Sequence, residues 1–542
     1  MMTVISPHAT ALSLALSEWA SVLGPENVST DLPHRKTLET TSFECTSKVH
    51  AVLFPGSVED VVRCLGIARG HGIPLYPVST GKNWGYTSGA PTADAVILNL
   101  GRMNQILDFN EELGYVTIEP GVTQRQLFDY LRSRQSKLWM DATGASPDCS
   151  IIGNTVERGF GHTPYSDHFA HSCNLQIVLP SGDIIQTGMG EMPGAKAAPL
   201  YRWGVGPFVD GLFSQSNLGI VTRMTIWLMP APECVEAFFF KVDGDEDLPQ
   251  LLDALRPLRM DGTLKSACHI GNDYKVLCGL QTYPWQETGG AAPLQPETLS
   301  QIAKKLNFGA WNGSGALYGT KRQVSEARRL VRRALKGKVQ RLKFLDERKL
   351  GLAMRFAKIA KPFTSWDLSQ TLELLRPLFG LIQGVPTDQP MKSCYWRKPG
   401  FNVAACDSST LDPDRDRCGL IWCSPLAPLS GPHVHEMTSI CISTLLEYKF
   451  EPMISLTLMT ERTVGCVVSI IYDRDVEGED ERARLCHEEL LDRLARRGYY
   501  PYRLGIQSMD VMRHTGPLGQ FLNGLKNYLD PQHILAPGRY EA

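Results

Sequence analysis

The sequence predicts an α+β protein of two or three domains, and three observations support this fold class. The chain has 542 residues, which exceeds one ordinary domain. It contains 48 Gly and 35 Pro, which indicates many tight turns and a mixed fold rather than a helical bundle. Short helices and strands alternate in the first third, whereas long amphipathic helices separate strand-like runs in the middle.

The first 232 residues are predicted to form a unit of alternating short elements. Ser57, with Asp60 three residues later, predicts a capping box and a helix. Thr123 predicts the cap of a second helix, and Ser181-Gly182 predicts a hairpin turn. The other expected strands cover residues 73–78, 96–100, 115–119 and 220–229. Pro232 follows the last strand closely, and we place a domain boundary there.

Residues 233–490 have a different pattern, which predicts an antiparallel sheet with helices on one face. Strands are expected at residues 237–242, 454–458 and 466–472, and helices at 297–306, 325–335 and 480–497. Residues 491–542 form a third segment, in which a helix is expected from Gly519 to Leu529, before Asp530-Pro531.

Composition and charge argue against several classes of protein. The 55 Lys and Arg nearly balance the 57 Asp and Glu, so a chain built mainly to bind nucleic acid or an anionic membrane is excluded. The 14 cysteines include no CxxC pair and the histidines show no ligand spacing, so neither a disulfide framework nor a metal is expected. No apolar run reaches membrane-span length, and the first residues lack the basic region of a signal peptide, so we expect a cytoplasmic protein.

A glycine-rich stretch, PVSTGKNWGYTS at residues 77–88, follows a predicted strand and has the clearest chemical meaning. Its small residues let the backbone curl, so that several N–H groups converge on one anion. Hydroxyl donors and a lysine charge add to this nest, and a diphosphate is the expected ligand. The candidate residues are Ser79, Thr80, Gly81, Lys82 and Asn83. The motif is neither a Walker loop nor GxGxxG, and an ordinary polar loop is the alternative.

A second glycine-rich stretch, IIGNTVERGFGHTPYSDH at residues 151–168, permits close backbone approach to a flat ligand. Three further motifs accompany it: IEPGVT at 118–123, DGLFSQSNLGIVT at 210–222 and ILAPGR at 534–539. Together these segments resemble the FAD-binding domain of the vanillyl-alcohol oxidase / p-cresol methylhydroxylase flavoprotein family. The resemblance runs nearly end to end and is strongest over residues 50–232 and 498–539.

The resemblance implies FAD as the cofactor and a two-part FAD-binding domain. Residues 1–232 and 491–542 would form that domain, and residues 233–490 would form a substrate cap with an antiparallel sheet. Besides the first glycine-rich stretch, the expected FAD-binding residues are Cys149, Ser150, Gly153, Asn154, Gly161, His162, Gly219, Ile220, Val221 and Arg539.

The family oxidises para-alkylphenols by hydride transfer to flavin N5 through a quinone methide, and the resemblance implies this chemistry here. The positions that match its phenolate-binding residues are Tyr86, Tyr502 and Arg503. An arginine and two tyrosine hydroxyls aimed at the phenolic oxygen would lower its pKa and hold the oxyanion. Judged without the resemblance, such a Tyr-Arg pair is more often a structural ion pair. Tyr502 and Arg503 also need a local bend, because adjacent strand residues point to opposite faces.

Asp167 matches an acidic residue that lies near flavin N5 in the oxidase branch of the family. It is therefore the candidate base toward the quinone methide or a group that tunes flavin reduction. A helix cap without a chemical role is the alternative.

The sequence departs from the family pattern in four places. Leu420 occupies the position of the His or Tyr that tethers the flavin, so non-covalent FAD is expected. Cys149 lies four residues before Gly153, the spacing of a 6-S-cysteinyl link in a related branch, and that link is the alternative. His162 replaces a Tyr and is expected to be structural rather than a donor at the flavin edge. Residues 463–466 replace a Met-His-His run, so we expect the cap side to lack imidazoles and to accept a larger phenol.

The leading hypothesis is an FAD-dependent oxidase or dehydrogenase of a para-substituted phenol, in the range of natural-product intermediates. An enzyme for a non-phenolic alcohol or hydroxy acid and a non-catalytic flavin-binding protein are the alternatives. Dioxygen or a redox protein is the expected electron acceptor, and a homodimer or larger homo-oligomer is the expected assembly. The basic stretch at 328–343 is either a docking site for an acidic redox protein or a solvated helix face.

Overall fold

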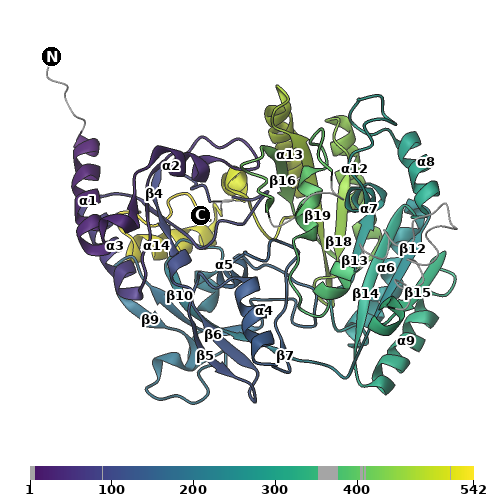
Figure 1. Cartoon of the computed structure of the whole chain (residues 1–542), viewed down its shortest axis with the longest axis horizontal. Helices are drawn as coiled ribbons and strands as arrows, with labels where there is room; N and C mark the ends of the chain where they lie inside the picture. The colour runs from purple at the N-terminus through teal and green to yellow at the C-terminus, as the bar shows by residue number, and fades with distance from the viewer. Residues whose placement is uncertain are drawn as a thin grey trace.

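The computed structural model describes residues 7–541 except 88, 352–375, 403–406, 408–409 and 513. The last residue of the PVSTGKNWGYTS stretch therefore lies outside the described residues. The chain folds into two halves that lie side by side (Figure 1). The N-terminal part and the C-terminal segment share one half, and the middle of the chain forms the other.

The first sheet has four strands in the order β1 (Val28–Ser29), β2 (Val49–Leu53), β4 (Ala95–Asn99) and β3 (Leu75–Val78). β2, β4 and β3 are parallel, because α3 (Val58–His71) forms a crossover connection between β2 and β3. α1 (Pro7–Leu23) packs on α3, and α2 (Leu32–Glu39) packs beside β2. The first glycine-rich stretch begins in β3, at the carboxyl end of a buried parallel strand.

The second sheet has five antiparallel strands in the order β5 (Ile106–Asn110), β6 (Tyr115–Ile118), β10 (Ile220–Trp227), β8 (Ser172–Val178) and β9 (Ile184–Gln186). α4 (Gln124–Ser133) and α5 (Ile151–Val156) pack with this sheet around one apolar core. A two-stranded ribbon of β7 (Leu138–Trp139) and β11 (Met229–Pro230) extends from it. The second glycine-rich stretch begins with α5, so the sheet positions it beside the first one.

The third sheet has eight antiparallel strands, and we call it the cap sheet. Its order is β15 (Arg341–Leu345), β12 (Cys234–Val242), β14 (Trp311–Gly319), β13 (His269–Asn272), β18 (Met453–Thr457), β19 (Thr463–Asp473) and β16 (Cys418–Cys423), with β17 (Leu426–Pro428) also on β19. Four helices cover one face in a row: α9 (Lys321–Leu335), α6 (Leu248–Met260), α12 (Gly431–Glu447) and α13 (Glu479–Arg496). α7 (Asp273–Leu280) and α8 (Pro296–Leu306) pack together in a separate apolar cluster.

The two faces of the cap sheet differ in composition. Ile454 and Leu456 of β18, like Cys466 and Val468 of β19, pack into the core under the helices. The residues between them point to the opposite face, because side chains alternate along a strand. That opposite face lies toward the first half of the molecule and carries small and polar side chains, which leaves space next to it.

The structure confirms the predicted fold class, and most predicted elements lie within a few residues of the observed ones. Ser57 and Thr123 cap α3 and α4 through their side-chain oxygens. The capping box at Ser57 differs in one detail. Asp60 donates its backbone N–H to Ser57, but its carboxylate accepts from the N–H of Gly56 instead of that of Ser57. Asp60 therefore holds the residue before the cap.

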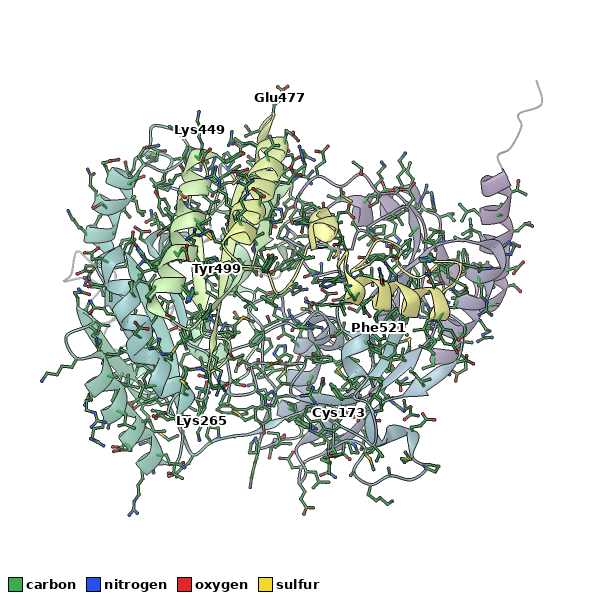
Figure 2. All side chains as sticks on the ribbon, turned by 180° about the vertical axis from the view of Figure 1, so that it is seen from behind. Cys173, Lys265, Lys449, Glu477, Tyr499 and Phe521 are labelled. Carbon is green, nitrogen blue, oxygen red and sulfur yellow. The ribbon has the colours of Figure 1, made fainter. Side chains whose placement is uncertain are left out.

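The C-terminal segment returns to the N-terminal half of the molecule. Viewed from behind, it leaves the cap near Tyr499 and reaches α14 (Pro517–Leu529), which carries Phe521 (Figure 2). Leu535 then forms a parallel bridge with Leu75 of β3 and packs into the core under α1 and α3. Two residues from opposite ends of the chain, Leu75 and Leu535, thus meet in one core.

A buried ion pair fixes this return. The ammonium of Lys526 on α14 lies 2.8 Å from the Asp530 carboxylate, and both side chains are less than 5% exposed. Lys526 also donates to the carbonyl oxygens of Asn217 and Leu535. Asp530 accepts from the backbone N–H groups that follow α14, so the pair organises both the turn and its attachment.

We expect Asp530→Asn to lower the free energy of unfolding by about 3 kcal/mol, because it leaves the buried ammonium of Lys526 without its counter-charge. Urea unfolding followed by tryptophan fluorescence measures this change. The matched control is Asp492→Asn, which breaks the exposed pair with Arg496 and is expected to change stability by less than about 0.5 kcal/mol. Equal losses in the two variants would contradict a structural role for the buried pair.

Candidate active site

A cavity of about 560 Å³ lies between the two N-terminal sheets and the cap sheet. Its volume is within the roughly 300–1,000 Å³ of cofactor and small-molecule sites. All fifteen residues predicted to bind the cofactor line it: Ser79, Thr80, Gly81, Lys82, Asn83, Cys149, Ser150, Gly153, Asn154, Gly161, His162, Gly219, Ile220, Val221 and Arg539. Tyr86, Tyr502 and Arg503 line the same cavity. The tertiary structure therefore brings four distant segments of the chain to one site.

The two glycine-rich stretches touch each other at the cavity wall. The hydroxyl of Thr80 accepts a hydrogen bond from the Ser150 N–H (3.0 Å), and Gly81 has the left-handed backbone conformation with φ of 68°. A Cβ atom on Gly153 would lie 2.5 Å from the Ser79 hydroxyl oxygen, so a larger residue would displace the Ser79 side chain. Small residues and hydroxyls on both walls fit a flat ligand with an anionic group, as the resemblance to FAD-binding proteins implies.

Lys82 lies at the edge of the same loop. Its ammonium is 3.6 Å from the Asp412 carboxylate and lies over the Trp84 ring. The ammonium group that was expected to face an anionic ligand thus also pairs with Asp412, which belongs to the cap half.

Tyr86 and Arg503 are in direct contact at one end of the cavity. The Tyr86 hydroxyl is 2.6 Å from the Ser424 hydroxyl, and the Arg503 guanidinium lies over the Tyr86 ring, 4.5 Å from its centre. Arg503 donates through Nη2 to the Asn83 side chain (2.8 Å), and its Nε faces the Glu157 carboxylate at 3.5 Å. Arg503 is therefore held between the Tyr86 ring, Asn83 and Glu157.

Tyr502 reaches the cavity because the backbone bends after Pro501. Pro501 forms an isolated bridge with Pro425, and the residues that follow it are in a bend rather than a strand. The Tyr502 N–H donates to the Ser424 carbonyl, and its ring packs edge-on against Phe160. This bend supplies the geometry that two adjacent cavity-lining residues need, since an extended strand would direct them to opposite faces.

Glu157 connects this tyrosine–arginine cluster to the C-terminus. Its carboxylate forms ion pairs with Arg539 and, at 3.5 Å, with Arg503. Burial raises the pKa of Glu157, but the charges of Arg539 and Arg503 outweigh burial and hold this pKa below its usual value. Glu157 therefore stays ionised. The sequence analysis did not predict a role for Glu157. Its position as the acidic residue of the GNTVERG motif, within the second glycine-rich stretch, is the signal that could have identified it.

The hydroxyl groups of both tyrosines are neutral. Burial raises the pKa of Tyr86 and of Tyr502, and the Arg503 charge offsets this only in part. Two neutral O–H donors beside a fixed guanidinium can stabilise an oxyanion that enters the cavity. Ser424, which holds the Tyr86 hydroxyl, was also missed from the sequence because nothing in its local pattern marks it.

Asp167 lies apart from this arrangement. It does not line the cavity, and its carboxylate accepts the Ala170 N–H (3.0 Å) in the following turn. Residues 168–170 form a turn rather than a helix, so the Asp167 carboxylate closes a turn, and its expected role as a base stays a prediction. The Asp141 carboxylate contacts the second glycine-rich stretch, because it accepts from the backbone of His162 and Thr163 and from the His168 ring.

Two positions bear on flavin attachment. Leu420 is buried on β16 in an apolar cluster and has no nucleophilic atom. Cys149 lines the cavity, but burial raises the pKa of its thiol to about 11. All thirteen cysteines among the described residues are free.

The cap wall of the cavity corrects one expectation. Gly465 and Val467 of β19 line it, in agreement with the loss of imidazoles from this strand. However, His269 on the neighbouring part of the cap sheet also lines the cavity, and its ring packs on His162 with 4.6 Å between ring centres. The expectation that the cap side lacks imidazoles is therefore wrong. A strand distant in sequence supplies one, which motif matching on residues 463–466 could not reveal.

Neither a metal-binding cluster nor a membrane-spanning helix occurs in the part of the chain that the structure describes. No group of histidines, cysteines and acids there is arranged to hold a metal ion. Within the same residues, every helix is too short or too polar to cross a bilayer.

Comparisons with known proteins agree with this geometry. The family model for an FAD binding domain matches residues 49–188. The chain is 44% identical to 1'-carboxy-chondrochloren decarboxylase of Chondromyces crocatus, over 98% of this chain and 97% of that protein. It is 30% identical to the 4-cresol dehydrogenase [hydroxylating] flavoprotein subunit of Pseudomonas putida, over 97% of this chain and 94% of that protein.

A solved structure is similar over the whole fold. The 4-ethylphenol oxidase of Gulosibacter chungangensis, in its isoeugenol complex, superposes with a TM-score of 0.87 at 28% identity and covers 99% of this chain and 98% of that one. The similarity extends over the full length of the chain, and a model of an FAD binding domain matches its N-terminal part. The glycine-rich segments of this chain also line one cavity. The chain belongs to the vanillyl-alcohol oxidase / p-cresol methylhydroxylase family of FAD-dependent oxidoreductases.

Proposed function

We propose that the protein oxidises a para-substituted phenol whose side chain carries a carboxyl group, and that this group leaves as CO₂. The observation that carries the proposal is the buried cluster of Tyr86, Tyr502 and Arg503, which lines the cavity of the FAD-binding segments and places tyrosine hydroxyls beside a guanidinium. In this proposal the chain divides at residues 232 and 490 into an FAD-binding domain, a cap and a returning C-terminal segment.

The cluster acts on the phenolic oxygen. Loss of a hydride from the benzylic carbon leaves a cation unless the para oxygen is already an oxyanion. Arg503 and the two tyrosine hydroxyls hold that oxyanion, while Glu157 keeps Arg503 in place and charged. FAD, when bound, supplies the hydride acceptor at its N5 atom. The Ser79–Asn83 and Ser150–Asn154 segments would hold this cofactor against the cluster.

The carboxyl group follows from the relative that is 44% identical and is named a decarboxylase. Hydride loss converts the phenolate of a 3-(4-hydroxyphenyl)propanoate unit into a quinone methide. The bond to the carboxylate then breaks, its electron pair forms the side-chain double bond, and the ring becomes a phenolate again. One hydride and one CO₂ leave, so a carboxylic acid becomes an alkene without added water.

Arg503→Ala is expected to lower kcat/KM for phenolic substrates about 100- to 1,000-fold, because it removes the charged partner of the oxyanion. Steady-state assays on a panel of 4-alkylphenols and non-phenolic alcohols measure this loss. Reoxidation in air, compared with reoxidation by a redox-dye acceptor, identifies the electron acceptor in the same assays. The matched control is Arg496→Ala, since that guanidinium is exposed on α13. Unchanged phenol turnover in the Arg503 variant would refute the phenolate mechanism and favour a non-phenolic alcohol.

The decarboxylation step predicts a specific product. Under anaerobic conditions, 3-(4-hydroxyphenyl)propanoate labelled with ¹³C in its carboxyl group is expected to yield 4-vinylphenol and one labelled CO₂ per flavin reduced. Mass spectrometry measures both products. 4-Propylphenol is the control, because it has the same chain length and no carboxyl group. Flavin bleaching with the label retained in a hydroxylated acid would show that water, rather than CO₂ loss, resolves the quinone methide.

The flavin is expected to be bound without a covalent link. Leu420 offers no nucleophile, and a thiol with a pKa near 11 is almost wholly protonated at neutral pH. Acid precipitation of the purified holoenzyme should therefore release the yellow flavin to the supernatant, in the wild type and in Cys149→Ser alike. Flavin that stays in the wild-type pellet and leaves the Cys149→Ser pellet would establish the cysteinyl link instead.

A further inference from the structure

Two imidazoles from different halves of the molecule meet at the cavity. His162 comes from the second glycine-rich stretch, and His269 comes from β13 in the middle of the cap sheet. Their ring centres are 4.6 Å apart and the ring planes are inclined by 33°. Neither residue has a role in the phenol chemistry described above.

Among the described residues, a buried nitrogen of the His269 ring has no hydrogen-bond partner. His162 Nδ1 lies 3.0 Å from the Ala142 carbonyl oxygen, to which only a protonated nitrogen can donate. His269 Nδ1 lies 3.1 Å from the Thr457 hydroxyl, while its buried Nε2 has no partner among the described residues. The Thr457 hydroxyl can donate to Nδ1 or accept from it, and when it donates, the proton of His269 is on Nε2. A buried N–H of this kind is costly unless a ligand accepts from it.

The cap sheet places His269 at a distance from the tyrosine–arginine cluster. In the strand register, Leu426, Gly465, Thr457 and His269 are direct neighbours across four strands. Three strand spacings correspond to roughly 14 Å between the first and last Cα atoms. Leu426 is two residues from Ser424, which holds the Tyr86 hydroxyl. The cluster and the imidazole therefore lie on opposite sides of the cap face, with Gly465 between them.

We propose that His269, supported by His162, donates from Nε2 to the carboxylate of the substrate and selects para-substituted phenols that carry one. This inference rests on the proposed function and adds the recognition of the leaving group. The phenolic oxygen is held at the cluster, and the carboxylate reaches across the small side chains of β18 and β19. Thr457 is a positioning residue, because its hydroxyl orients the imidazole and selects its tautomer.

A neutral donor suits a carboxylate that must leave as CO₂. Burial, with a contribution from His162, lowers the pKa of His269 to about 3, so the ring is uncharged at neutral pH. A full ion pair would stabilise the carboxylate more than the neutral CO₂ that it becomes, and would slow the bond cleavage. A neutral N–H fixes the position of the carboxylate with less of this ground-state stabilisation.

Lys275 is the competing candidate for the carboxylate. It is the third residue of α7 and lines the cavity, and no ion pair is found for it among the described residues. It packs beside Gly271, two residues along β13 from His269. Variants of the two residues therefore separate an imidazole site from an ammonium site on the same wall.

Equilibrium binding of two matched phenols tests the proposal without turnover. The probes are 4-hydroxycinnamate and 4-(1-propenyl)phenol, which share ring and chain but end in a carboxylate and a methyl group. Their Kd values are measured from the change in the flavin absorption spectrum of the holoenzyme. In His269→Phe we expect the Kd for 4-hydroxycinnamate to rise at least about tenfold and that for the propenylphenol to stay within about twofold.

Three further variants complete the test. His269→Gln keeps a hydrogen-bond donor and is expected to retain most of the preference for the carboxylate probe. Thr457→Val removes the hydroxyl that orients the imidazole and is expected to lose part of this preference. Lys275→Met is expected to change neither Kd. Loss of 4-hydroxycinnamate binding in Lys275→Met but not in His269→Phe would overturn the proposal, as would equal weakening of both probes in His269→Phe. If the wild-type holoenzyme binds the propenylphenol with a Kd no higher than that for 4-hydroxycinnamate, this inference is overturned but the proposed function is not. Failure to bind either phenol would contradict the proposed function as well.

Discussion

The ion-pair cluster around Glu157 is the interaction on which the site depends. One carboxylate from the second glycine-rich stretch holds Arg503 of the segment that leaves the cap and Arg539 near the end of the chain. Three parts of the sequence that could otherwise separate are joined by two guanidinium groups and one acid. All three side chains are largely buried, so water competes little for these contacts. In the proposed function, the same charge thereby fixes the arginine that binds the phenol and the segments that hold FAD.

The cap sheet provides the second constraint. Alternation along its strands sends apolar residues into a core under four helices and leaves small or polar residues on the cavity face. Gly465, Ser455 and Thr457 therefore form a floor rather than a packed wall. This single feature explains both the room for a side chain longer than a methyl group and the access of His269 to a ligand. In the proposed function, the cap therefore selects the substrate, while the N-terminal half holds the cofactor.

The fold was largely predictable because its signals are local. Caps such as Ser57 and Thr123, and the hairpin after Val178, follow from hydrogen bonds and turn conformations within a few residues. The glycine-rich stretches were recognisable for the same reason, since each is a continuous run with a backbone requirement. Asp167 shows the limit. It stands inside such a run, yet its carboxylate accepts from the N–H of Ala170 in the following turn. Asp141, twenty-six residues earlier, accepts from the N–H of Thr163 within the run.

By itself, the sequence determined the fold class, the cofactor and the tyrosines and arginine that line one cavity, because these are encoded in contiguous motifs. Only the tertiary structure decided which groups act on those residues. Glu157, Ser424 and His269 each acquire a partner from a segment more than a hundred residues away, and no local pattern marks Ser424 or His269. Ion pairing, burial and strand register are properties of the folded chain, so the charge of Arg503 and the buried nitrogen of His269 become visible only there.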